Sequence, residues 1–247
     1  MKAKTLLLTL AIFLTLLLEG TYSHAQFLTI DLGKSDLMSA KIIQLIGLIT
    51  ILSIAPSILI MVTSFTKISV VLSFVRTAVG LQQTPPNPVI ISLALFLTFF
   101  IMAPTFEKAY ENGLYPLMQN TIKEAAALQN ITNPFRDFML DNVREKDLSL
   151  FSNMARLEAE EALKENIPLH VLIPAFMISE LKKAFEIGFL IFLPFLVIDM
   201  LVSSILMAMG MMMLPPVVIS LPFKIIFFVL IDGWYMLCGS LVKSYGL

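Results

Sequence analysis

Methionines crowd one short stretch of the sequence, and their sulfur atoms could bind a metal. The residues MAMGMMMLPP (207–216) hold methionine at Met207, Met209 and Met211, and again at Met212 and Met213. Soft thioether sulfurs select Cu(I), so a copper or small-solute transporter is one interpretation. The chain has two histidines and one cysteine, none of them in this stretch. The metal interpretation therefore lacks the supporting ligands that it needs, and the run has more methionines than a ligand set requires.

Two other interpretations of the same stretch need no metal. Methionine could simply fill a membrane core, because its side chain adapts to irregular gaps. Alternatively, a ring of such flexible and polarizable side chains, one set per subunit, could seal a pore and still yield to a passing chain. Gly210 would allow a local bend, and Pro215 with Pro216 would stop the helix and hold the connection in the lumen.

Charged residues in apolar surroundings form the second group with possible chemistry. An ionised group at bilayer depth costs at least ~2.5–3.5 kcal/mol, so such groups persist when they are paired or face water. Snorkelling to an interface is an alternative for Lys224, near the start of its segment, but not for Asp199. We expect pairs between segments or between subunits, and the candidates are Glu180, Lys183, Glu186, Asp199, Lys224 and Asp232.

Catalytic motifs are missing from the sequence. There is no phosphate-binding Walker loop, no GxSxG nucleophile elbow and no HExxH zinc motif. His170 is expected to lie in a loop. We therefore predict that the protein is not an enzyme and has no cofactor. The formal net charge of −1 gives no electrostatic case for a nucleic-acid partner.

The composition places these residues on membrane helices. Hydrophobic residues make up 57% and charged residues 14% of the chain, about half the charge of a soluble domain, and the mean hydropathy is +0.87. Intervals without charge predict four apolar segments, at about 42–62, 89–106, 187–209 and 217–238.

Prolines lie in or beside these apolar segments, and we expect helix breaks at Pro194, Pro215, Pro216 and Pro222. Kinked helices are tolerated where protein or a water-filled cavity lines the freed backbone, which favours a stack of such helices around an axis.

A more polar stretch separates the second and third segments. Residues 107–165 hold 11 acidic and 7 basic side chains. Helical spacing of apolar residues at 117–128 and 153–163 predicts a helical insertion, at about 107–184, with turns at Asn133-Pro134 and at Ile167-Pro168.

The N-terminus and the loop charges predict the orientation. Lys2 and Lys4 precede an apolar run that ends at Ser23-His24-Ala25, which is typical of a cleaved signal peptide over residues 1–25. The alternative is an uncleaved first membrane helix, for which the run is short. Lys67 and Arg76 lie in the short connection between the first two segments, which we expect inside the cell. The insertion then faces outward.

Several long stretches resemble the FliP family of flagellar type III export-gate proteins, whose virulence relatives form the SctR branch. These are KISVVLSFVRTAVGLQQTPPNPVIISLALFLT (67–98), PAFMISELKKAFEIGF (174–189), MGMMMLPPVVISLPFK (209–224) and VLIDGWYMLCGSL (229–241). The resemblance covers essentially the whole of residues 26–247. The injectisome relatives share this core, but they typically lack a cleaved signal peptide, so residues 1–25 favour the flagellar branch.

The resemblance implies an all-α, membrane-associated fold of kinked helical hairpins that assemble into a helical, conical multi-subunit pore. It implies five FliP subunits with one FliR and several FliQ, contacts with FlhB and FlhA, and a place in the inner membrane at the flagellar basal body. Exported rod, hook and filament subunits would pass through the pore, and the insertion would face the periplasm. The family's methionine gasket falls on Met211, Met212 and Met213, with Met209 as a weaker member. The four-segment map would then describe insertion alone, because much apolar surface would be buried between subunits above the membrane.

Overall fold

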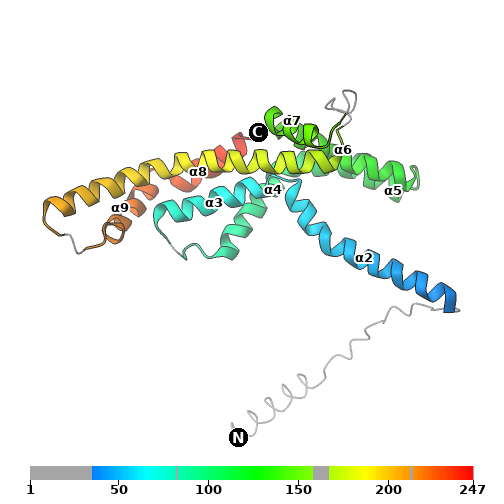
Figure 1. The fold of residues 1–247 in the computed structure, drawn as a ribbon, viewed down its shortest axis with the longest axis horizontal. Coiled ribbons are helices and arrows are strands. Elements are labelled where there is room, and N and C mark those ends of the chain that lie inside the picture. Colours follow the sequence, from blue (N-terminus) through cyan, green and yellow to red (C-terminus); the bar gives the residue numbers. More distant parts are fainter. Residues whose placement is uncertain (1–34, 82, 158–166, 212–213, 247) are drawn as a thin grey trace, which may run out of the picture. The chain divides into compact units, whose positions relative to one another are not determined.

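The computed structural model describes residues 35–81, 83–157, 167–211 and 214–246 (Figure 1), and within them it contains helices and no strand. The signal peptide predicted at residues 1–25 lies outside these ranges. The α-helices are α2 (Ser35–Met61), α3 (Phe65–Val79), α4 (Asn87–Ala109), α5 (Tyr115–Met118), α6 (Glu124–Asn142), α7 (Glu145–Met154), α8 (Leu169–Ala208), α9 (Pro216–Leu230) and α10 (Gly233–Lys243), and a π-helical turn, η1 (Tyr110–Leu114), joins α4 to α5. The all-α prediction is confirmed.

The chain divides into two units, residues 1–53 and 54–247. The first contributes the N-terminal part of α2, where side chains such as Ile43 and Leu52 are exposed. The second holds every other helix and both hydrophobic cores.

Helix α3 lies at the centre of the larger core. Ile68, Val71, Leu72 and Val75 recur at the spacing of one helix face, and all four are buried. They pack with buried residues of α4, α8 and α10. At the far end, Gly80 adopts φ +89, a left-handed conformation that glycine reaches without strain, and its N–H bonds to the last turn. The short connection expected between the first two apolar segments is therefore wrong, because most of it is the buried helix α3.

Helix α8 is the long element against which α3, α6, α7 and α9 pack (Figure 1). Its first part forms a second core with α6 and α7, in which Phe176 and Leu172 meet Met139 and Leu148. Residues 169–184, which the sequence analysis assigned to the insertion, are thus the first part of this continuous helix. The helices of the insertion lie against it.

The helix limits correct several expectations inside the insertion. A turn separates α5 from α6 within the helix expected at 117–128, and α7 ends at Met154, where the helix expected at 153–163 was to begin. Residues 158–163 of that helix lie outside the described ranges. Pro134 is buried inside α6 and makes no turn. Ile167 and Pro168 are not helical, and α8 begins directly after Pro168, which occupies its N-cap position. The turn expected there stays a prediction.

Two of the expected helix breaks are also corrected. Pro194 lies inside α8 and Pro222 lies inside α9, and both helices continue through them. Side chains of α8 on both sides of Pro194 pack in the larger hydrophobic core, and this packing supports the helical backbone despite the lost amide donor. Pro215 and Pro216, by contrast, mark the start of α9, where the missing amide costs nothing.

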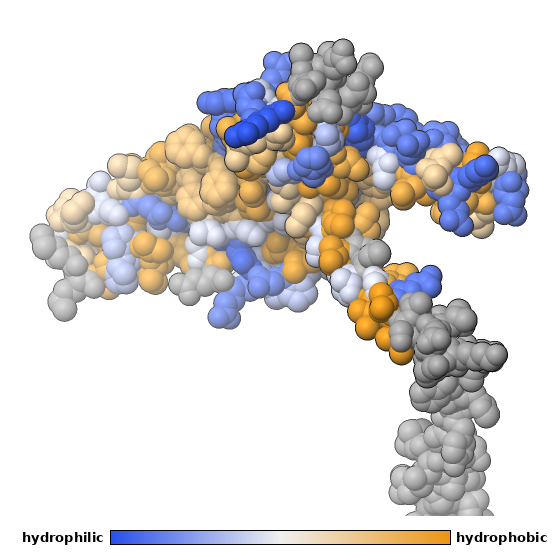
Figure 2. Space-filling model, turned by 45° about the vertical axis from the view of Figure 1, so that its right-hand side comes forward, coloured by the Kyte–Doolittle hydropathy of each residue, from blue (hydrophilic) through white to orange (hydrophobic). Residues whose placement is uncertain are grey.

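The helices agree with the four apolar segments. Ile42–Met61, Asn87–Met118 and Leu169–Ala208 are long and apolar enough to cross a membrane, and α9 with α10 would make a fourth span, bent by 61°. Hydrophobic side chains are spread over much of the surface in Figure 2, while hydrophilic ones gather over the insertion helices.

Candidate functional site

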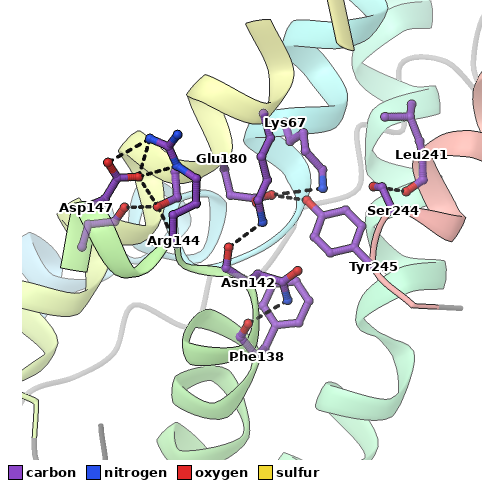
Figure 3. Close-up of polar contacts among 12 residues, drawn as sticks. Lys67, Phe138, Asn142, Arg144, Asp147, Glu180, Leu241, Ser244 and Tyr245 are labelled. Atoms are coloured by element: carbon purple, nitrogen blue, oxygen red, sulfur yellow. Dashed lines mark hydrogen bonds and ion pairs between the residues drawn. The ribbon is translucent and has the colours of Figure 1, made fainter. Parts of the chain in front are cut away.

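A buried polar cluster joins α3 and α8 to the segment after α10 (Figure 3). The Lys67 ammonium lies 3.7 Å from Glu180 Oε2, and both side chains are buried, with exposed fractions of 1% and 0%. The hydroxyl of Tyr245 donates a hydrogen bond to the same carboxylate oxygen. Lys67 Nζ also lies 3.4 Å from the centre of the Tyr245 ring, an attractive contact between a cation and a π face. Three segments far apart in the sequence are therefore tied at one carboxylate.

A second lysine and an aromatic ring complete this cluster. Lys183 Nζ lies 3.3 Å from Glu180 Oε1 and donates a hydrogen bond of 2.6 Å to the carbonyl of Asn142, at the end of α6. The ring of Phe138, also from α6, stacks on Tyr245 at 5.6 Å between centroids. Among the described residues, Glu180 Oε1 has no hydrogen-bond partner, and Lys183 is the cation in contact with it. The Glu180 carboxylate thus lies between the ammonium groups of Lys67 and Lys183, and Lys183 connects it to the end of α6.

Burial shifts the pKa values of Lys67 and Tyr245 in opposite directions. Burial lowers the pKa of Lys67 to about 8, although the nearby Glu180 carboxylate partly restores it. Burial raises the pKa of Tyr245 well above its ordinary value, and the negative charge of Glu180 raises it further. Tyr245 therefore remains a proton donor over the whole physiological range.

A neighbouring network binds α7 to α8. Ser179 donates a 2.6 Å hydrogen bond to Asp147 and accepts one from the backbone N–H of Arg144. The Arg144 guanidinium donates two hydrogen bonds to the same Asp147 carboxylate. Desolvation raises the pKa of Asp147, but the hydrogen bonds from Ser179 and Arg144 outweigh it, so the pKa lies below its ordinary value. This arrangement fastens the insertion to α8 at Ser179, the residue directly before Glu180.

Asp199 and Lys224 form an ion pair within one chain. Lys224 Nζ, buried in α9, lies 2.6 Å from Asp199 Oδ2 in α8, and Ser220 donates a 2.5 Å hydrogen bond to the other oxygen. Lys224 also reaches the carbonyl of Ala78, at the end of α3, at 3.4 Å. Of the two kinds of partner expected from the sequence, in another segment or in another subunit, Asp199 and Lys224 have the first, because each pairs with a neighbouring segment of the same chain.

The other two candidate charges lie on the surface. Glu186 pairs with Lys182 one turn before it on α8, at 3.0 Å, and both side chains are more than half exposed. Asp232 is exposed at the bend between α9 and α10 and, among the described residues, has no recorded ion pair. Its backbone adopts φ 50, in the left-handed region.

The methionine stretch connects α8 to α9. α8 ends at Ala208, Gly210 adopts φ +72, and α9 begins at Pro216. Met209 and Met211 are exposed. Met212 and Met213 lie outside the described residues.

Of the residues that bind Glu180 in the buried cluster, Lys67 and Tyr245 were not among the candidates from the sequence. Lys67 was assigned to a connecting loop, although the apolar spacing that follows it is the signal of a buried helix face. Tyr245 carries no such signal, because its role depends on how the chain folds back on α3 and α8. Across the described residues, no three His, Cys, Asp or Glu side chains are grouped so that they could hold a metal ion. What the arrangement can do is tie helices together by buried charge.

Comparison with known proteins adds an independent result. A model of the FliP family matches residues 48–241. A "Flagellar biosynthetic protein FliP" from Caulobacter vibrioides is 56% identical over 216 residues, which is 87% of this chain and 81% of that protein. Proteins of the same name from Agrobacterium fabrum and Bacillus subtilis are 52% and 53% identical, over 97% and 89% of this chain and 98% and 99% of theirs.

Proposed function

The chain belongs to the FliP family, and from this premise we propose that it is a pore-forming core subunit of the flagellar type III export gate. In this role it acts without catalysis and passes unfolded rod, hook and filament subunits across the inner membrane. The names of the relatives favour the flagellar apparatus over the injectisome. They also favour this role over copper or small-solute transport.

One observation carries the proposal, namely the methionine connection at the tip of the hairpin formed by α8 and α9. Met207, Met209 and Met211 are exposed there, and the Asp199–Lys224 ion pair ties the two helices together behind them. A methionine-rich connection between two paired helices suits a seal, because methionine side chains adapt their shape while the helices hold the connection in place. We propose that Met209, Met211, Met212 and Met213 form this seal, one set from each subunit.

The exposed apolar surface supports assembly with other chains. Soluble monomers rarely expose large contiguous apolar patches, whereas exposed Phe185, Phe189 and Leu190 lie side by side on α8, next to the Lys182–Glu186 ion pair. We propose that residues 26–247 form the export-gate domain after loss of residues 1–25, in a pentamer with FliQ and FliR near FlhB and FlhA at the basal body. The insertion faces the periplasm, and Asp232 is the remaining candidate for a pair across a subunit boundary.

The test replaces the connection methionines in the full-length protein expressed with its partner subunits. The variant carries Met211→Ala, Met212→Ala and Met213→Ala. The control replaces three methionines elsewhere by alanine, at the exposed positions Met118, Met154 and Met200. Complex yield on native gels, membrane conductance to small ions and secretion of flagellar subunits are measured for both.

We expect the connection variant to assemble at wild-type yield and to conduct ions, whereas the control stays closed. The physical reason is that alanine removes the flexible atoms that close the lumen and leaves the hairpin intact. Assembly with wild-type conductance and secretion in the connection variant would refute the sealing role, and an equal leak in the control would do so as well.

A further inference from the structure

Helix α10 is held to the rest of the chain by a narrow stripe of side chains. Its buried residues are Gly233, Leu237 and Leu241, one on each successive turn. Cys238 and Val242 beside this stripe are half-buried, whereas the side chains on the opposite face are exposed, and Tyr235 is 78% exposed. α10 therefore has little apolar packing for its length.

Open grooves lie on both sides of this stripe. One, of about 690 Å³, runs between α4 and α10 and is lined by Phe100 and Cys238 among others. The other, of about 360 Å³, lies between α10 and the helices α3, α8 and α9, and Pro194 and Met236 are among its lining residues. A Cβ added at Gly239, in the first groove, would meet nothing within 4 Å. Empty space on both sides leaves room for α10 to move.

The bend before α10 has the features of a pivot. α9 and α10 are joined by Ile231 and Asp232 and make an angle of 61°. Asp232 adopts φ 50, and its side chain does not cap the helix that follows. Gly233 lies so close to the ring of Phe228 that an added Cβ would stand 2.3 Å from it. A few residues at the end of an element are the usual place where a hinge absorbs backbone rotation.

Tyr245 fixes the other end of α10. Among the described residues, its hydroxyl makes the one recorded side-chain hydrogen bond from residues 233–246 to another element, and the acceptor is the buried Glu180. Lys67 on one side of its ring and Phe138 stacked against it hold the side chain in place. The contact belongs to the α3–α8 core, which does not depend on α10 for its own ion pair.

We propose that α10 is a hinged element that pivots at Ile231–Asp232 and is latched shut by Tyr245 on the Lys67–Glu180 cluster. Releasing the latch frees α10 from α4 and joins the two grooves, while α3 and α8 stay packed. The proposal concerns motion within one chain and goes beyond the sealing role of the methionines.

The sole cysteine of the chain reports this motion, because Cys238 lies on α10 and is half-buried in the groove toward α4. The variant is Tyr245→Phe, which removes the hydroxyl and keeps the ring. The matched control is Tyr235→Phe, the same change on the exposed face of α10. Maleimide labelling of Cys238 and hydrogen exchange of the amides in α3 and α10 are measured on the purified full-length protein.

We expect Tyr245→Phe to label at Cys238 roughly 10- to 100-fold faster, as the loss of one buried hydrogen bond to a charged acceptor implies. The rate of amide hydrogen exchange in α10 should rise as well, while the rate in α3 stays within about twofold of the wild-type rate. Tyr235→Phe should match the wild type in both measurements. Faster exchange in α3 and α10 alike, or no change in α10, would overturn the latch. If Tyr245→Phe does not fold, hydrogen exchange of the wild-type protein still tests the proposal. Equal protection of the amides in α3 and α10 would overturn the latch.

Discussion

Replacing Glu180 by glutamine tests whether the buried cluster holds the fold together. In Glu180→Gln the charge is lost, and Lys67 is left buried with the Tyr245 ring as its remaining partner. Removing one member of a buried ion pair costs about 3–5 kcal/mol, because the other charge stays uncompensated. In a chain of this size that loss lowers the midpoint of thermal unfolding by roughly 6–20 °C.

The structure also predicts an asymmetry between the two partners. In Lys67→Met the Glu180 carboxylate keeps Lys183 at 3.3 Å and the hydroxyl of Tyr245, so the expected loss is about 1–2 kcal/mol. The double variant, with Glu180→Gln and Lys67→Met, leaves no buried charge behind and should be more stable than Glu180→Gln alone. The order of stability is thus wild type, Lys67→Met, and Glu180→Gln last.

The assay is thermal unfolding of the purified full-length protein in detergent, followed by far-ultraviolet circular dichroism. Glu186→Gln is the matched control, because it makes the same change on the same helix in a pair that is 57% exposed on the glutamate side. Exposed pairs contribute under about 1 kcal/mol, so this midpoint should move little. Equal losses in Glu180→Gln and Glu186→Gln, or a larger loss in Lys67→Met, would refute the reasoning.

Two further predictions follow from protonation and from close packing. Because the pKa of Lys67 is lowered to about 8, the unfolded chain binds more protons than the folded one between pH 8 and pH 10. The free energy of unfolding should then rise with pH in that window, on the order of 1–2 kcal/mol in denaturant titrations. It should fall again above pH 10, where Tyr245 stays protonated only in the folded state; a flat profile would contradict the assignment. Gly188→Ala should lose about 1–3 kcal/mol, because its Cβ would stand 2.4 Å from the Phe74 ring, whereas Gly239→Ala should be neutral or better. Equal unfolding midpoints for the two alanine variants would rule out the close contact.

Local signals predicted the membrane helices but not the elements that depend on tertiary packing. Uncharged intervals found the apolar part of α2, α4 and α8, because the transfer of a charge into lipid is costly at every position. The same signal does not detect α3, because Lys67 and Arg76 interrupt the uncharged interval and their charges are typical of a connecting loop. A buried lysine is stable there because the Glu180 carboxylate neutralises its charge. The spacing of residues in the sequence cannot predict this ion pair, since the two residues are more than a hundred positions apart.

Prolines misled the prediction of helix limits in a similar way. The local rule expects a break at Pro194 and a turn at Pro134, since each removes an amide donor. Packing of the flanking turns in α8 and α6 overrides it. At Pro216 the local rule predicts the structure correctly, because proline stands in the first turn of α9, where the backbone needs no amide donor.

The length of α8 has a consequence for where its apolar side chains can lie. Forty residues at 1.5 Å each make a helix about 60 Å long, twice the roughly 30 Å thickness of a bilayer's hydrocarbon core. Even at a steep tilt of about 40°, it would extend well beyond that layer. Exposed apolar side chains occur near both ends, with Leu169 and Ile178 in one half and Ile205 and Met207 in the other. Whichever half lies in lipid, the exposed side chains of the other half need a second protein surface to shield them from water.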